Sequence, residues 1–476
     1  MNGNDLLRIG YQQGKVIKVA LAAARTFRQQ NHASAENALN ALTEVLNAPE
    51  SFTGDPLFGA VAETLLSEAL TNSGYDVSNP APYRVWGASN IEPGAMEQMK
   101  RAVSLPVAVR GAMMPDAHVG YGLPVGGVLA THNSVIPYAV GVDIACRMRL
   151  TIFNTPPYLL EQKREKFRRI LEDNTRFGPG VTWEPRIDHP VMEDPLWDEH
   201  PIARQFKDRA WRQLGTSGSG NHFVEFGALT VTTPIADSAG TVPPGKYLAL
   251  LSHSGSRRLG MEIAEHYTAI AMQQRAALPK AFLQLAWLDL DNWAGAEYWA
   301  GMELAGRYAS ANHEVIHALI AEAVRIDVLG VVENHHNFAW KESFEGQEVI
   351  VHRKGATPAG VGVLGVIPGS MAAPGYVVRG RGEPESLASA SHGAGRRMSR
   401  GEAMKRFDWT TVKKKLKAEG VDLLSAGLDE SPGAYKDIKL VMADQADLVE
   451  TLAEFAPLMV KMDATPARNN HGDRDA

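Results

Sequence analysis

Apolar residues recur with a helical spacing in the first 80 residues of the chain. The run between Leu39 and Leu46 repeats at three- and four-residue intervals, and Ser34 stands before it where a helix N-cap is expected. No motif of recognisable chemistry lies in this part. A polar, turn-rich stretch, SNPAPY, ends at Tyr83. We therefore expect an N-terminal helical segment over residues 1–82.

From Val107 onward the pattern changes to short β-branched runs, which predict strands. Examples are Tyr247–Ser252 and Val328–Val332, each of which ends in a loop of Gly, Ser, Asn or His residues. Glycine allows a loop backbone to approach a ligand closely. We therefore expect polar chemistry at strand ends. The composition of the last dozen residues, TPARNNHGDRDA, predicts disorder.

Composition places the chain among globular proteins. It has 476 residues, of which 45% are hydrophobic, and this is enough for a large buried core. No apolar run approaches the roughly 20 residues of a membrane span, and the N-terminus lacks the pattern of a secretory signal. We expect a cytoplasmic protein without a membrane partner. The single cysteine, Cys146, excludes an internal disulfide framework, so it is either a buried apolar residue or a reactive thiolate.

The formal net charge of −6 argues against sequence-independent coating of nucleic acid, which needs a basic global field. Two local basic runs stand out, Lys163–Arg169 and Lys413–Lys417. Both mix cations with apolar residues as a helix does. Such runs are typical of solvated helix faces, and local basic patches are the alternative.

A candidate metal site centres on Cys146. Asp143 lies three residues before it, in the segment AVGVDIACRMRL. Two further loops, GSGNHF and LLSHSGSR, carry His222 and His253 beside small residues at the ends of strand-like runs. A lone histidine at such a place is usually structural. Several of them together with the sole cysteine favour a metal site, and the donor types admit Mn²⁺, Zn²⁺ or Fe²⁺.

A third histidine loop, ENHHNFAW, offers His335 and His336. Adjacent residues of an extended segment point to opposite faces, so only one of the two can easily face a common centre. The residues alone do not choose between them.

A second constellation follows IPGSM in the segment SHGAGRRMSR. His392 precedes a Gly-Ala-Gly turn and a predicted helix start, an arrangement that can hold phosphate oxygens. Arg396 and Arg400 would then share a helix face that grips phosphates, with a surface ion-pair stripe as the alternative. Neutral imidazole can attack phosphorus, although His392 could also be a structural cap. The segment MPDAHVGYG adds Asp116 and His118, and an aspartate could fix the tautomer of a nucleophilic imidazole.

These motifs resemble those of the RtcB family of RNA-splicing ligases. MPDAHVGYGLPVGG, GVDIAC, GSGNHFVE, HSGSR, HHN, RKGA, IPGSM, SHGAGRRMSR and AYKDI occur in the family's order between Tyr83 and Lys461. The resemblance implies an α+β fold: one large domain over residues 83–462 with mixed sheets and Gly-rich loops at strand ends, followed by a disordered tail over 463–476. It also implies two Mn²⁺ ions and GTP as cofactors.

The resemblance assigns roles to single residues. The implied metal ligands are Asp143, Cys146, His222, His253 and His336, with the thiolate bridging both ions. His392 would become guanylylated, and Asp116 would orient it. The implied GTP pocket comprises Asn221, His222, Phe223, Val224, Glu225, His336, Asn337, Pro368, Gly369, Ser370, Met371, His392, Gly393, Ala394, Gly395, Tyr435 and Lys461. Arg396 and Arg400 would hold RNA phosphates.

The implied reaction joins RNA ends. A 2′,3′-cyclic phosphate is opened to a 3′-phosphate, which receives GMP from His392, and a 5′-hydroxyl end then displaces the GMP. The chain departs from the family pattern at Gly375, where many relatives have serine, and at Met462, which replaces a glycine. Both departures concern the guanine site.

Two other functions compete with ligation. A metal-dependent phosphoesterase could hydrolyse a cyclic phosphate with the same ions, but the intact loop around His392 argues against it. A non-catalytic RNA-binding paralogue would more naturally have lost a metal ligand, and every matched ligand is present. The sequence names neither the RNA that is joined nor a protein that activates the enzyme.

Overall fold

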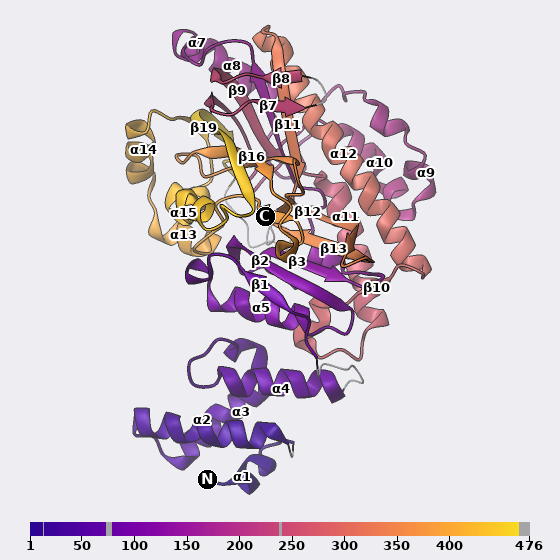
Figure 1. The fold of residues 1–476 in the computed structure, drawn as a ribbon, viewed down its shortest axis with the longest axis vertical. Coiled ribbons are helices and arrows are strands. Elements are labelled where there is room, and N and C mark those ends of the chain that lie inside the picture. The colour runs from indigo at the N-terminus through magenta and orange to yellow at the C-terminus, as the bar shows by residue number, and fades with distance from the viewer. Residues whose placement is uncertain (13, 73–78, 238–239, 466–476) are drawn as a thin grey trace.

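The computed structural model describes residues 1–12, 14–72, 79–237 and 240–465. Two large sheets and a set of helices form the main body of the molecule, and a smaller helical lobe lies below it (Figure 1). The expected α+β class is confirmed. None of the helices within these described ranges is long and apolar enough to cross a membrane.

The N-terminal lobe consists of α1 (Gly3–Arg8), α2 (Lys15–Asn31), α3 (Ala35–Asn47) and α4 (Gly59–Asn72). Leu6, Val16, Leu42 and Val61 are fully buried in a core that these helices share. Ser34 caps α3 as predicted, because its side chain accepts a hydrogen bond from the backbone N–H of Asn37.

A five-stranded sheet follows the lobe. Its order is β1 (Tyr83–Val85), β2 (Ala108–His118), β3 (Val125–Thr131), β13 (Gln347–Lys354) and β12 (Asn337–Phe344). α5 (Pro93–Val103) packs on β2 at Gly111, where a Cβ atom would lie 2.2 Å from Met99 and 2.7 Å from Val103. Glycine is required at this position because the helix lies so close to the strand.

An eight-stranded sheet forms the centre of the molecule. Its order is β11 (Val328–His335), β5 (Arg147–Phe153), β9 (Gly245–Ser254), β6 (Phe223–Val231), β19 (Val449–Met462), β16 (Gly375–Gly380) and β15 (Leu364–Ile367), and β18 (Asp422–Ser425) pairs with β19. The strands predicted at Tyr247–Ser252 and Val328–Val332 are confirmed as parts of β9 and β11.

Helices cover one face of this sheet. They include α8 (Arg164–Asn174), α10 (Pro201–Gln213), α11 (Arg257–Gln274) and α12 (Trp293–Val324). Phe167 of α8 meets Phe226 of β6 edge to face, with ring centroids 5.1 Å apart. Ile316 of α12 packs in the same fully buried cluster. The shorter helices are α6 (Pro137–Val140), α7 (Tyr158–Gln162), α9 (Leu196–Glu199), α13 (Arg400–Arg406), α14 (Trp409–Ala418) and α15 (Ile438–Ala443).

Four strand ends meet at one edge of the eight-stranded sheet. The strands β5, β9, β6 and β11 pair in antiparallel fashion, so β5 and β6 begin where β9 and β11 end. His253 of β9 lies opposite both Met148 of β5 and Phe223 of β6. His335, the last residue of β11, lies opposite Arg147. The polar loops predicted at strand ends are therefore brought together by the register.

The chain leaves the sheet after β19. Thr465 donates hydrogen bonds to the Asp463 carboxylate at 2.9 and 2.7 Å, so the first residues of the predicted tail are ordered. The remaining part of that predicted tail, residues 466–476, lies outside the described residues.

Candidate active site

The turn that carries Cys146 has a strained backbone. Ala145 adopts a left-handed conformation with φ 56°, which is unfavourable for a residue with a side chain. Two hydrogen bonds hold the turn: the Cys146 N–H donates to the carbonyl of Asp143 at 3.1 Å, and the Ala145 N–H donates to the carbonyl of Asn337 at 2.7 Å. The turn places the sulfur beside the histidine loops.

Five side chains converge at the sheet edge. Cys146 Sγ lies 3.4 Å from Nε2 of His222 and 3.1 Å from Nε2 of His253. His253 Nε2 lies 3.2 Å from Nε2 of His336, and His222 Nε2 lies 3.1 Å from Oδ2 of Asp143. The five atoms thus form a continuous row, Asp143–His222–Cys146–His253–His336, with the sulfur in the middle. The ligand atoms of Cys146, His222 and His253 all lie within 4.8 Å of one another.

Backbone carbonyls orient two of these imidazoles. His222 Nδ1 faces the carbonyl of Ser217 at 2.9 Å, and His253 Nδ1 faces that of Asn221 at 3.4 Å. A carbonyl can only accept, so Nδ1 of His253 carries the proton and its Nε2 keeps a lone pair directed at the cluster. Nδ1 of His222 also faces the guanidinium group of Arg257, which can only donate. The backbone N–H of Ser256 donates to Oδ1 of Asp143 at 3.1 Å and holds the carboxylate in place.

This arrangement fits a divalent cation. His222 Nε2 and Asp143 Oδ2, an imidazole nitrogen and a carboxylate oxygen that can both bind a metal ion, face each other at 3.1 Å. Within the described part of the chain, His336 Nδ1 and Asp143 Oδ2 are buried without a hydrogen-bond partner. Ligands of a tetrahedral ion with bonds of about 2.0–2.3 Å lie roughly 3.3–3.6 Å apart, close to the separations seen here.

Burial controls the protonation of the cluster. It raises the pKa of the Cys146 thiol well above its ordinary value, and the neighbouring Asp143 carboxylate raises this pKa further. Burial also lowers the pKa of His253 and of His336 well below the ordinary value. For Asp143, burial opposes ionisation, but His222 and then Arg257 outweigh it and lower the pKa to about 2. The site therefore presents one carboxylate together with the neutral imidazoles of His253 and His336.

His392 is held by a buried aspartate on β2. Oδ2 of Asp116 accepts three hydrogen bonds, from Nδ1 of His392 at 2.7 Å, from the His392 N–H at 3.1 Å and from the Gly393 N–H at 3.3 Å. Burial opposes ionisation of Asp116, but the bond from His392 and the charge of Lys436 outweigh it and lower the pKa. His392 therefore keeps the Nε2 lone pair that a nucleophile needs.

The nucleophile candidate lies beside the metal centre. The ring centroids of His392 and His336 are 4.9 Å apart. His392 and His253 also line the same cavity. A phosphate bound in this cavity would be within reach of both the imidazole and a bound ion.

The cavity contains most of the predicted nucleotide site. It encloses about 820 Å³, including the part open to solvent. From the predicted set, its walls include Asn221, Phe223, Glu225, Pro368, Gly369, Ser370, Met371, His392, Gly393, Ala394, Gly395 and Tyr435. Gly375 and Met462, the two departures from the family pattern, also line it. The departures thus change the wall of the cavity itself.

Glu225 is the chemically distinctive residue of the wall. It is 5% exposed, and burial raises the pKa of its carboxyl well above the ordinary value. Nothing in the described ranges forms a hydrogen bond with this carboxyl. Beside it on the wall, Tyr435 donates a hydrogen bond to Glu430. A carboxyl group in such a place can recognise the amino and imino groups of a purine base.

Lys461 does not line the cavity. Alternation along β19 places Val460 and Met462 on its wall and sends Lys461 to the opposite face of the strand. There its ammonium group donates to the carbonyls of Leu171 and Glu172 at 3.2 Å. The placement of Lys461 in the nucleotide pocket stays a prediction, and its ammonium group lies away from this wall in the structure.

Four other residues of the predicted nucleotide set lie off the wall. They are His222, Val224, His336 and Asn337. Val224 is fully buried in the apolar cluster beneath the sheet. Asn337 is structural, because its amide donates to the carbonyl of Asp143 and accepts from the N–H of Gly355.

The prediction that Arg396 and Arg400 share a helix face was wrong. α13 begins at Arg400, capped by the side chain of Ser399, so Arg396 precedes the helix. Arg400 pairs with Asp429 at 2.7 Å and with Glu430, and Arg396 pairs with Glu430 at 3.4 Å. The ion-pair alternative therefore describes both arginines, and two buried carboxylates balance their charges.

Sequence reasoning missed several supporting residues. Lys436 donates to the carbonyls that flank Asp116, at 3.1 Å for Pro115 and 2.7 Å for Ala117. Arg257 lies 3.1 Å from Nδ1 of His222. Both lie inside motifs that had been noticed, AYKDI and HSGSR, but only the fold reveals what they contact.

Comparison with known proteins gives a consistent result. The sequence profile described as "tRNA-splicing ligase RtcB" matches residues 98–196 and 192–463. RNA-splicing ligase RtcB of Escherichia coli (strain K12) is 31% identical over 417 residues, which cover 78% of this chain and 95% of that protein. tRNA-splicing ligase RtcB of Thermococcus kodakarensis is 28% identical over 466 residues, which cover 81% of this chain and 95% of that protein.

Proposed function

This chain belongs to the RtcB family of RNA ligases, and we propose that it joins RNA ends in splicing or repair. The substrates would be one RNA end with a 3′-phosphate or 2′,3′-cyclic phosphate and another with a 5′-hydroxyl. GTP would be consumed, and two Mn²⁺ ions would occupy the cluster around Cys146. The observation that carries this proposal is the hydrogen bond of 2.7 Å between Asp116 and His392, beside the metal ligand His336.

The first chemical step would take place at His392. Its Nε2 attacks the α-phosphorus of GTP, a phosphorus–nitrogen bond forms, and pyrophosphate leaves. Asp116 holds the Nδ1 proton and balances the positive charge that develops on the ring. The Gly393 N–H is already bonded to Asp116, so the N–H groups of Ala394 and Gly395 in the same turn would bind the phosphate oxygens.

The second and third steps would use the RNA ends. A 3′-phosphate oxygen attacks the phosphorus of the His392–GMP adduct, and the imidazole leaves with its lone pair restored. The 5′-hydroxyl oxygen then attacks the activated 3′-phosphate, GMP leaves, and a phosphodiester bond remains. Before these steps, a cyclic phosphate end would be opened by water to the 3′-phosphate.

The ligand set supports two metal positions. Asp143, His222 and Cys146 would hold one ion, and Cys146, His253 and His336 would hold the other. Successive ligand atoms along this row lie 3.1–3.4 Å apart. Bound divalent ions polarise phosphoryl oxygens and lower the pKa of an attacking group. The carbonyl of Asn221 keeps the lone pair of His253 Nε2 directed at these positions, and the carbonyl of Ser217 orients the ring of His222.

Guanine recognition would fall to Glu225. A carboxylate that accepts from the N1–H and N2 amino groups of guanine compensates for its own burial, whereas adenine offers no matching pair. Tyr435 and Phe223 provide ring surfaces on the same wall. With Gly375 and Met462 in place of a serine and a glycine, specificity in this chain would depend more on Glu225.

GMP transfer to the protein tests the proposal. The protein is mixed with Mn²⁺ and α-labelled GTP, and an adduct that is acid-labile and alkali-stable is expected. His392→Ala should lose the adduct and keep its bound metal, whereas Cys146→Ala should lose both. Labelling that survives His392→Ala would contradict the assignment of the nucleophile. An unlabelled wild-type protein that still hydrolyses cyclic phosphate ends would be a phosphoesterase.

A further inference from the structure

The two basic runs of the sequence meet at one groove on the surface. Lys413 and Lys417 of α14 line this groove together with Arg164 of α8, although the two helices are far apart along the chain. The groove encloses about 790 Å³, including the part open to solvent. It is separate from the nucleotide cavity, and we refer to it as the α8–α14 groove.

The surroundings of the groove are strongly positive. Between Lys405 and Lys417 the sequence contains six lysine and arginine residues and a single acid, Asp408. All six cations are exposed. Within the residues that the structure describes, none of these six has a carboxylate oxygen within 4.0 Å. This concentration of unbalanced charge contrasts with the net charge of −6 of the whole chain.

The one acid in the wall of the groove is already occupied. Asp422 accepts from Arg168 of α8 at 2.7 Å and lies 3.5 Å from Arg164. Its negative charge ties α8 to β18 and is balanced by these two guanidinium groups. Lys413 and Lys417, four residues apart on one face of α14, keep their charges for a partner.

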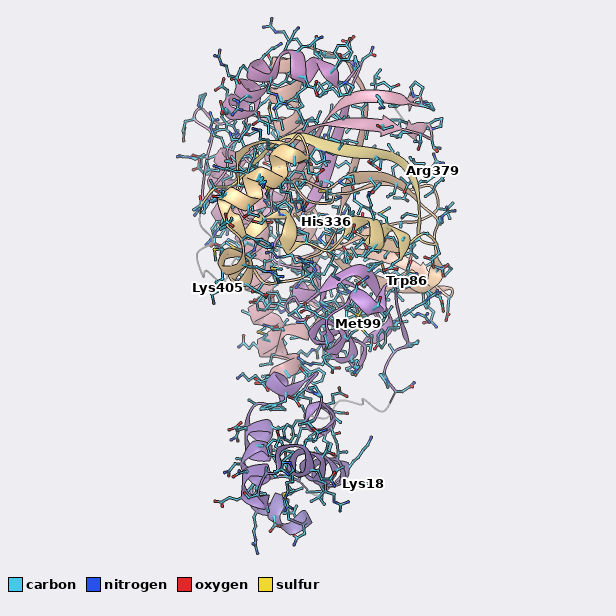
Figure 2. All side chains as sticks on the ribbon, turned by 90° about the vertical axis from the view of Figure 1, so that its left-hand side faces the viewer. Lys18, Trp86, Met99, His336, Arg379 and Lys405 are labelled. Carbon is cyan, nitrogen blue, oxygen red and sulfur yellow. The ribbon has the colours of Figure 1, made fainter. Side chains whose placement is uncertain are left out.

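The groove lies directly behind the wall of the nucleotide cavity. Leu416 of α14 packs in one apolar cluster with Met371 and Met462, and both of these line the cavity. α13, which leads into α14, is fixed by the ion pair of Arg400 with Glu430, another cavity residue. In Figure 2 the helices α13 and α14 face the viewer, and Lys405 is labelled at the edge of this side.

We propose that the α8–α14 groove binds the phosphodiester backbone of the RNA, away from its reacting end. This inference rests on the proposed function, which supplies a polyanionic substrate but leaves open where its body lies. Point charges on flexible lysine stems suit a sequence-independent backbone contact. The half-buried Trp409, whose ring has Lys413 5.9 Å from its centroid, adds an aromatic surface of the kind on which bases stack.

The same surface is poorly suited to a membrane. The apolar residues of α14, Val412 and Leu416, are 4% and 1% exposed, so the helix has no free apolar face to insert. An acidic protein partner would meet the same charges, and the experiment below separates that case from RNA.

RNA binding by the full chain tests the groove. The probe is a short single-stranded RNA with hydroxyls at both ends, which cannot react, and its Kd is measured by fluorescence anisotropy over a range of salt concentrations. For K413Q/K414Q/K417Q we expect a Kd at low salt that is at least about tenfold higher than that of the wild type. The slope of log K against log salt concentration should be less steep by about two. K413R/K414R/K417R keeps the charges and should bind as the wild type does.

The matched control removes the same number of cations from another exposed helix. K18Q/R25Q/R28Q lies on α2 in the N-terminal lobe (Figure 2, Lys18) and should change the Kd less than about twofold. Equal losses in both triple variants, or no loss in the α14 variant, would overturn the proposal. The proposal would also be overturned if the α14 variant bound RNA normally and failed only to bind an added acidic protein. The partner of the groove would then be acidic protein.

Labelling with GTP separates this inference from the proposed function. The α14 variant should form the GMP adduct at the wild-type rate, because no side chain of the groove enters the nucleotide cavity. If the wild type fails to label, the proposed function fails, while the RNA-binding result still decides whether the groove binds RNA.

Discussion

At the scale of single residues, charge and tautomer are set by a few short contacts. Asp116 receives three hydrogen bonds on one oxygen, and this fixes which nitrogen of His392 carries a proton. Lys436 bridges the carbonyls on either side of Asp116 and so holds the aspartate from behind. Asp116 and, behind it, Lys436 therefore set the orientation and tautomer of His392, the proposed nucleophile.

Asp116→Asn tests the effect of the Asp116 carboxylate on His392. The amide keeps the shape of the carboxylate but not its charge, so the cation that develops on His392 loses its counterion. We expect the single-turnover rate of GMP adduct formation to fall by about 10²- to 10⁴-fold. Metal content, measured by elemental analysis, should stay at the wild-type level. A rate within about threefold of the wild type would contradict the role of Asp116.

Gly255→Ala tests whether one of the two proposed metal positions can be lost without the other. A Cβ atom at Gly255 would lie 2.2 Å from Oδ1 of Asp143, so the carboxylate must move, whereas His253 and His336 keep their places. We expect the protein to bind one Mn²⁺ equivalent in place of two, measured by titration with electron paramagnetic resonance detection.

Gly401→Ala is the control for that substitution. Nothing lies within 4 Å of a Cβ atom at Gly401 in α13, so both equivalents should remain bound. Two equivalents in Gly255→Ala would mean that Asp143 is not a ligand. Loss of both Mn²⁺ equivalents in Gly255→Ala would mean that binding at one position depends on binding at the other.

Residue type predicted much of the site. Asp143, Cys146, His222 and His253 were selected because their donor atoms sit in loops at strand ends. The residues alone could not choose between His335 and His336. The structure directs His336 to His253, while His335 packs against the rings of Phe338 and Trp340 at 5.0 Å. The contacts of Arg396 and Lys461 could not be predicted because their partners are distant in sequence.

At the scale of elements, the site depends on strand register. The strands β5, β6, β9 and β11 bring their ends to one edge only because neighbours run antiparallel. Strand existence could be predicted from β-branched runs such as Tyr247–Ser252. Strand order could not, because pairs such as β6 with β19 join segments more than two hundred residues apart. The helix start predicted after His392 failed because the Gly-Ala-Gly turn continues as a loop to Ser399.

Phe226→Ala tests the packing that supports this register. Phe226 of β6 is fully buried between Phe153 and Phe167, so its removal leaves a cavity under the strand that follows His222. We expect a loss of about 3–5 kcal/mol in the free energy of unfolding, measured with urea. Tyr158→Ala, at a residue that is 58% exposed, should cost less than about 0.5 kcal/mol. A loss of under about 1 kcal/mol at Phe226 would show that α8 does not support the sheet.

At the scale of the whole molecule, a helical lobe is joined to a catalytic body (Figure 1). The lobe has its own apolar core, and the family match begins only at residue 98. Its contacts with α5 are partly polar, such as Lys100 with Glu63 at 3.4 Å and Arg101 with Thr53 at 2.8 Å, and partly apolar, because Leu66 of α4 is buried in the same cluster as Met99. The boundary at residue 82 stays a prediction, since residues 73–78 lie outside the described part.

Removal of residues 1–82 tests that boundary. Because the lobe has an apolar core of its own and the family match lies outside it, the remainder should fold and label with GTP at a rate within about twofold of the full chain. Circular dichroism and the labelling assay measure the two properties. Aggregation of the shortened chain, or loss of labelling, would mean that the lobe is part of the catalytic domain.

The central claim is that His392 carries GMP on the way to an RNA joint, and a single-turnover experiment tests it most directly. The GMP adduct is isolated free of GTP and mixed with RNA ends that carry a 3′-phosphate and a 5′-hydroxyl. We expect one joined RNA and one released GMP for each adduct consumed. An adduct that is consumed without any joined RNA would contradict it.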